Sequence, residues 1–233
     1  MRDAHYAYVP ASALPAGGGQ WAALTGLSGE LVFDRNAMQV NGAQGRFAGA
    51  PGLQVQADAR IPNLDDSIVN VTGLVRGPLA QSLAVFNASP VSASLGQPFA
   101  RTVAGGPADL KLKLALPLAR IEQSRVQGSV ALSGNDLQVA PGVPALARAR
   151  GTVSFTERGF TLAGVQARAL GGDVRLEGGT RALPPRSTEA PSVIRATGTA
   201  TADGLRQARE LGPVPRLARS ATGATPYAVT VGL

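Results

Sequence analysis

The residues that could do chemistry are few and isolated. His5 is the only histidine in the 233-residue chain, and there is no cysteine. A metal site or a nucleophile–base set needs a second ligand or partner, and none accompanies His5 in the sequence. Asp65 and Asp66 form a carboxylate pair, but they follow Pro62 in a stretch typical of a solvated turn. Residues 17–19 are glycines without the Lys and Ser/Thr of a phosphate loop. The sequence therefore predicts no enzyme, no cofactor and no metal site.

The basic charge of the chain is spread along its length. There are 22 basic and 15 acidic residues, for a net charge of +7. Nucleic-acid binding needs a basic patch with stacking aromatic side chains, and aromatic residues make up only 4% of the chain. Nucleic acid is therefore not an expected partner. One stretch is locally basic, and we interpret it as a solvated face, with weak contact to anionic lipid as the alternative: Arg206, Arg209, Arg216 and Arg219.

Alternating apolar residues indicate that β-strands carry most of the fold. Apolar residues occupy the odd positions of residues 53–61 and polar residues all the even positions, which is the period of a half-buried strand. Leu110, Leu112, Leu114 and Leu116 alternate with Lys111 and Lys113 in the same way. The period changes at residues 78–86, where a proline opens a stretch with helical spacing, so a short helix is expected.

The same order of elements occurs twice. Residues 29–33 and 151–155 match at an offset of 122, and so do Gly42 and Gly164. The apolar phase flips after each of these glycines, which indicates a β-bulge. A second helix is expected at residues 204–211, followed by a closing strand with Tyr227, Val229, Val231 and Leu233.

These matches predict how the chain is divided. We expect a flexible lead-in at residues 1–22, a first repeat at 23–122 and a second repeat at 123–233, cut short at its C-terminal end. Residues 126–139 are expected to form an additional hairpin. No apolar run reaches the length of a membrane span, and the first ten residues lack the apolar stretch of a signal peptide. An export signal and an anchor are therefore expected to be absent from this chain.

The leucine rows predict an extended apolar binding surface and not a localised site of a few residues. One short helix per repeat is too small to cover an apolar sheet face several strands wide, and an uncovered apolar face binds something. Acyl chains suit such a face, because each buried CH₂ contributes about 0.8 kcal/mol without directional contacts. Packing of the same leucines as ordinary core under a helix is the alternative interpretation.

The sequence resembles the AsmA-like envelope proteins, and the YhdP branch in particular. The stretches LSGELVFDRNAMQVNGAQGRFAG and ARGTVSFTERGFTLAGVQARALGGDVRLEG carry the resemblance to the wider family. The order of GPLAQSLAVFNASPV, RTVAGGPADLKLKLALPL and VQGSVALSGNDLQV is similar to the YhdP branch. The resemblance covers roughly residues 27–233. It implies a periplasmic body with a hydrophobic groove, anchored in the inner membrane of Gram-negative bacteria by a helix absent here, which helps to move glycerophospholipids to the outer membrane.

The expected fold is therefore mainly β, a repeated, curled antiparallel sheet that forms a groove, with short helices at one rim. The expected function is passive conduction of phospholipid between the inner and outer membrane, with acyl chains as ligand and no catalysis. A structural or adhesive β-repeat protein without a lipid is the alternative. The residues expected to line the groove are Leu53, Val55, Leu110, Leu112, Leu114, Leu116, Val174, Leu176, Val229 and Val231.

Overall fold

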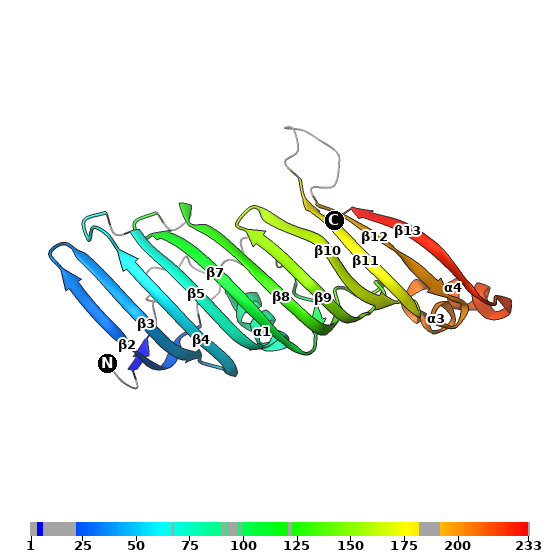
Figure 1. Ribbon diagram of the computed structural model, residues 1–233, viewed down its shortest axis with the longest axis horizontal. Helices are drawn as coiled ribbons and strands as arrows, with labels where there is room; N and C mark the ends of the chain where they lie inside the picture. Colours follow the sequence, from blue (N-terminus) through cyan, green and yellow to red (C-terminus); the bar gives the residue numbers. More distant parts are fainter. Residues whose placement is uncertain are drawn as a thin grey trace. The chain divides into compact units, whose positions relative to one another are not determined.

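The structure is a computed structural model that describes residues 4–6, 22–66, 68–89, 92, 97, 99–120, 123–181 and 192–232. Most of the predicted lead-in lies outside these ranges, as do residues 182–191, Leu233 and the side chain of His5. The predicted fold class is confirmed: the chain is mainly β, with antiparallel strands and a few short helices (Figure 1). It consists of two compact units.

The first unit comprises Met1–Ala100 and Pro107–Val130. Its elements are β1 (Ala4–Tyr6), β2 (Leu24–Asp34), β3 (Ala37–Phe47), β4 (Ala50–Ile61), β5 (Ile68–Pro78), α1 (Leu79–Ala88) and β7 (Pro107–Pro117). The strands pair antiparallel in the order β1-β2-β3-β4-β5-β7. Helix α1 begins after Pro78, close to the predicted start, and packs on β4 and β5.

The second unit comprises Arg101–Gly106 and Ala131–Leu233. Its strands are β6 (Val103–Ala104), β9 (Leu146–Thr156), β10 (Gly159–Ala169), β11 (Gly172–Thr180), β12 (Ser192–Thr201) and β13 (Ala224–Gly232). Four short helices join β12 to β13: α3 (Ala202–Gln207), η3 (Arg209–Leu211), α4 (Val214–Leu217) and η4 (Ala218–Ser220). Strand β8 (Arg125–Gln138) has residues in both units.

The two units repeat the same strands at the offset found in the sequence. Strands β2 and β9 begin at residues 24 and 146 and end at 34 and 156, which are differences of 122. Strands β3 and β10 begin at 37 and 159 and end at 47 and 169, again 122 apart. Each unit then places a helix between its last two long strands. The strand positions agree with the predicted repeat, while the division at residues 22/23 and 122/123 stays a prediction.

Both predicted bulges are present. Gly42 has a φ of +57° and Gly164 a φ of +67°, a backbone conformation that glycine adopts without strain. The pairing register shifts between Val40 and Ala43 in β3, and between Leu162 and Val165 in β10. Each bulge therefore lies at the same place in its unit.

The hairpin predicted at residues 126–139 is wrong. Those residues form the single strand β8, which runs from Arg125 to Gln138. Gly134 has a φ of +114° but does not reverse the chain. The Asn135 side chain lies fully buried beside it, where its Nδ2 donates to the Gly105 carbonyl at 2.9 Å and its Oδ1 accepts from the Ser133 amide at 2.9 Å. These hydrogen bonds to the backbone hold Asn135 within a continuous strand, where the predicted hairpin would need a turn.

Replacing Asn135 by alanine is expected to destabilise the second unit by about 1–3 kcal/mol, because the fully buried amide and its hydrogen bonds to two backbone groups are lost. Denaturant unfolding measures this change. Asn41→Ala is the control, since Asn41 is exposed and its amide contacts Glu30 only at 3.5 Å. That variant is expected to change stability by less than about 0.5 kcal/mol. Equal losses from the two variants would contradict the role assigned to Asn135.

Candidate apolar binding surface

The pairing of β4, β5 and β7 aligns apolar residues into rows on one side of the first unit. Val55 pairs with Val75, and Val75 pairs with Leu110. Directly opposed residues on neighbouring strands point to the same side of a sheet. Two parallel rows are Ala57, Gly73 and Leu112, and Ala59, Val71 and Leu114. We call this side the apolar face of the first unit.

The other side of the same strands is polar. Lys111 pairs with Leu74, and Lys113 pairs with Thr72, which itself pairs with Asp58. Both lysines are exposed, whereas Leu112 between them is half-buried. The prediction that the lysines lie on a wet side opposite the leucines is therefore confirmed.

One end of the apolar face is closed. Leu53 and Val55 have 0% and 9% of their surface exposed, and they form a core cluster with Ala50 and Val75. Val85 from α1 packs against this cluster, as does Leu110. The Gln81 side chain of α1 also accepts a hydrogen bond from the Gly52 amide at 2.9 Å. At this end the predicted lining residues are core packed under the helix.

Farther from α1, along β2 and β3, the apolar face is more exposed. Val40 pairs with Ala59 and with Leu31, so Leu31 extends the row that contains Leu114. Leu31 is 46% exposed, and Phe33 is 63% exposed. Leu112 and Leu114 are half-buried, while Leu116 is 7% exposed. The apolar face is thus closed beneath α1 and also at Ile61 and Leu116, and it is most accessible at β2.

The second unit has an equivalent face. Leu176 pairs with Ala196, and Ala196 with Val229, while Val174 joins the next row through Gly198. Val231 pairs with Ile194. All four residues predicted from this unit therefore share one side, but their exposure differs. Val174 is 4% exposed and Leu176 half-buried, whereas Val229 and Val231 on β13 are 48% and 45% exposed.

The structure thus collects the ten predicted residues on one apolar face in each unit. Whether they line a groove that holds lipid stays a prediction. Sequence reasoning did not single out Leu31, Phe33, Val71 and Val75, which extend these rows. Alternation gave no clear signal here, because the apolar Val32 lies between Leu31 and Phe33.

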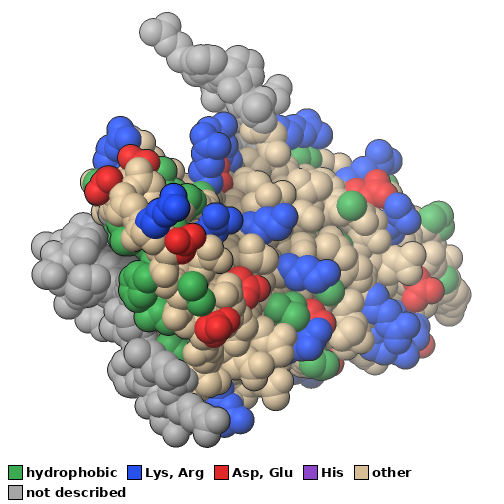
Figure 2. Space-filling model, turned by 60° about the vertical axis from the view of Figure 1, so that its left-hand side comes forward, with side chains coloured by type: hydrophobic (Ala, Val, Ile, Leu, Met, Phe, Trp, Pro, Cys, Tyr) green, Lys and Arg blue, Asp and Glu red, His purple; other side chains and the backbone are tan. Residues whose placement is uncertain are grey.

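Charged side chains lie away from the apolar faces. Arg76 and Asp109 form an exposed ion pair at 3.7 Å on the polar side of the first unit. Tyr227 pairs with Gly198 on the apolar face of the second unit, and burial raises the pKa of its phenol. Basic and acidic side chains are interspersed over the surface seen in Figure 2, and they form no single basic block there. This arrangement suits a ligand that contacts the protein through an uncharged, apolar part better than it suits a polyanion.

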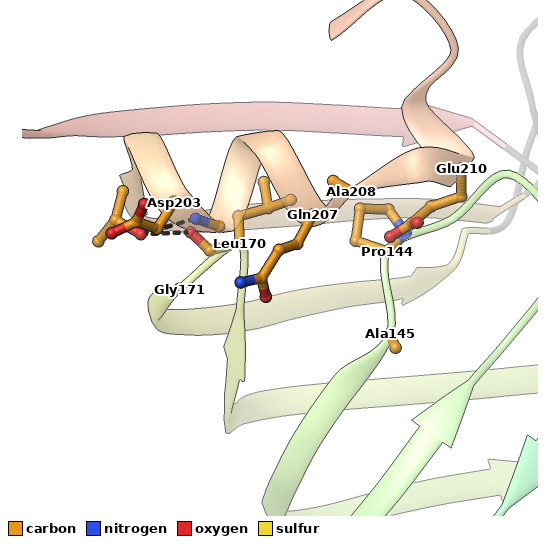
Figure 3. A pocket seen from close by; sticks show the side chains of 10 residues that line it. Pro144, Ala145, Leu170, Gly171, Asp203, Gln207, Ala208 and Glu210 are labelled. Carbon is orange, nitrogen blue, oxygen red and sulfur yellow. Dashed lines mark hydrogen bonds between the residues drawn. The ribbon is translucent and has the colours of Figure 1, made fainter. Parts of the chain in front are cut away.

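A small open pocket of about 410 Å³ lies in the second unit, beside the start of α3 (Figure 3). Thr201 caps α3 by accepting a hydrogen bond from the Gly204 amide at 3.0 Å. The two acids at the pocket are Asp203 and Glu210, and Asp203 is paired with Arg206. Among the described residues, no three His, Cys, Asp or Glu side chains are grouped to hold a metal.

The family of the chain follows from comparison with known proteins. A family model described as YhdP protein matches residues 1–232. The chain belongs to the YhdP family. Comparisons with curated proteins and with solved structures gave no match. No helix among the described residues is long and apolar enough to cross a membrane. Membership of the YhdP family is consistent with a cell-envelope protein. It suggests a role in transport or a structural role, and not a catalytic one.

Proposed function

We propose that the apolar faces of this YhdP-family chain form a segment of a hydrophobic groove that conducts glycerophospholipids between the inner and outer membrane. The groove would lie in the periplasm and belong to a protein anchored in the inner membrane. The observation that carries the proposal is the gradient of exposure on the first unit, from Leu53 at 0% to Phe33 at 63%. A helix covers the first of these ends, and large apolar side chains are accessible at the other.

The physical basis is the non-directional character of apolar contacts. Rows such as Leu31, Val40, Ala59, Val71 and Leu114 run across the strands, about 4.8 Å per strand. An acyl chain on such rows gains about 0.8 kcal/mol for each buried CH₂, and neighbouring rows offer nearly equal contacts. A lipid can therefore shift along the face without breaking hydrogen bonds. No residue has to act as a nucleophile or a base.

Photo-crosslinking tests the groove directly. A photoreactive residue is placed at position 112 or, as the matched control, at position 111, in cells that produce the protein in their envelope. The two positions are adjacent in β7 but lie on opposite sides of the sheet, Leu112 with the apolar row and Lys111 exposed. We expect phospholipid adducts at 112 and only a background level at 111.

Two results would contradict the proposal. Equal labelling at both positions would indicate chance encounter with membrane lipid. Labelling at neither position, in a protein that is folded and present at normal amounts, would favour the alternative of a purely structural β-repeat protein.

A further inference from the structure

The helical connection between β12 and β13, residues 202–220, is anchored firmly to the second unit. We call it the rim segment. Its small side chains Ala202, Ala208 and Ala218 are buried. The Arg206 guanidinium pairs with Asp203 and donates to the carbonyls of Ala218 at 3.2 Å and Ala221 at 2.9 Å. Arg206 thus ties the start of the rim segment to its end, which corrects its interpretation as part of a solvated face.

The rim segment carries one protruding leucine and three exposed arginines. Leu217 is 77% exposed, the largest exposure among the large hydrophobic residues described. Arg216 and Arg219 flank it in sequence, Arg209 belongs to the same segment, and all three are exposed. None of these three arginines has an ion-pair partner among the described residues.

The charge of the segment is unbalanced. It holds four arginines and two acids, Asp203 and Glu210, which leaves a net charge of 4 − 2 = +2. Since Asp203 and Arg206 neutralise each other, three arginines face a single partly buried acid. The equivalent helix of the first unit, α1, contains no charged residue at all. The cationic surface is therefore not a general property of the repeat.

We propose that the rim segment docks on the surface of a bilayer that contains anionic phospholipid. Leu217 enters the boundary between headgroups and acyl chains, and Arg209, Arg216 and Arg219 lie at the level of the phosphates. An exposed leucine among arginines fits this environment, since the apolar side chain leaves water while the guanidinium groups keep polar partners. A soluble anion would use the arginines but would leave Leu217 in water. This docking site is separate from the proposed groove.

Vesicle co-sedimentation of the chain tests the docking. The probes are vesicles of phosphatidylcholine alone and of phosphatidylcholine mixed with phosphatidylglycerol, at low and moderate salt. We expect binding to the mixed vesicles that weakens with salt. The triple variant Arg209→Gln, Arg216→Gln, Arg219→Gln is expected to bind on the order of 100-fold more weakly, given the contribution of each arginine near an anionic surface. Leu217→Ser is expected to weaken binding about 10-fold at either salt concentration, because its contribution is apolar.

A charge-matched control separates docking from general attraction. Arg150→Gln, Arg158→Gln, Arg195→Gln removes the same charge from exposed positions of the same unit outside the rim segment. We expect this variant to bind nearly as the unmodified chain does. Equal loss in the two triple variants, no effect of Leu217→Ser, or no binding to mixed vesicles would each overturn the proposal. Crosslinking at position 112 reports on the groove alone, so the two proposals can fail independently.

Discussion

Leu53→Asn is expected to destabilise the first unit by about 4 kcal/mol, whereas Leu112→Asn should cost less than about 1 kcal/mol. Leu53 has no exposed surface and lies in the cluster against which α1 packs, so an amide there is buried without partners. Leu112 is half-buried on the accessible part of the apolar face, where an amide can reach water. Denaturant unfolding, with hydrogen exchange to follow β4 and β7 separately, measures the two losses.

The contrast between these variants decides whether the leucine row is closed core or an open binding surface. Lys111→Asn, on the exposed side of the same strand, provides the baseline and should leave stability nearly unchanged. If Leu112→Asn costs 2–4 kcal/mol, as a closed core requires, the row is ordinary core. If it costs little and capture of lipid at that face also falls, the row is an open surface.

Gly204→Ala is expected to destabilise the second unit by roughly 2–4 kcal/mol, despite the better helix propensity of alanine. A Cβ atom at this position would lie 2.0 Å from both the carbonyl carbon and the oxygen of Leu170. These are backbone atoms, so the β10–β11 turn would have to move away from α3. Thermal unfolding of the variant measures the loss.

Gly105→Ala is the matched control for this prediction. Gly105 belongs to the same unit, and the nearest atom to its added Cβ is the Asp136 oxygen at 3.9 Å, an ordinary contact. The free energy of unfolding of the Gly105→Ala variant should stay within about 0.5 kcal/mol of that of the unmodified chain. A Gly204→Ala variant as stable as the control would show that α3 does not depend on this close approach.

Much of the fold could be predicted from the local periodicity of apolar and polar residues in the sequence. A period of two marks a strand and its two sides, so the alternation at residues 53–61 and 110–116 predicted both strands and the exposure of Lys111 and Lys113. The change of apolar phase after Gly42 and after Gly164 predicted two bulges. Each of these features depends on neighbouring residues alone, and such features can be read from a single sequence.

Features that depend on contacts distant in sequence could not be predicted in this way. Alternation assigns Leu53 and Leu112 to the same kind of face, but it does not show which of them α1 covers. Asn135 resembles a polar residue in a turn until the Gly105 carbonyl, 30 residues earlier, lies beside it. Arg206 resembled its three neighbouring arginines, and only the fold brings the carbonyls of Ala218 and Ala221 to its guanidinium.

The bulge at Gly42 has a consequence for which changes in length the chain can accept. Val40 and Ala43 are three positions apart, yet they pair with Ala59 and Ala57, which are two positions apart on the same side of β4. Gly42 therefore acts as a parity correction in the middle of β3. Deleting this one residue would leave Val40 and Ala43 two positions apart, the spacing of a regular strand, so both halves of β3 would keep their sides and only the bulge would be lost. Gly164 gives β10 the same tolerance, whereas deleting one residue from a strand without a bulge, such as β5, would turn the side chains of one half to the opposite side of the sheet.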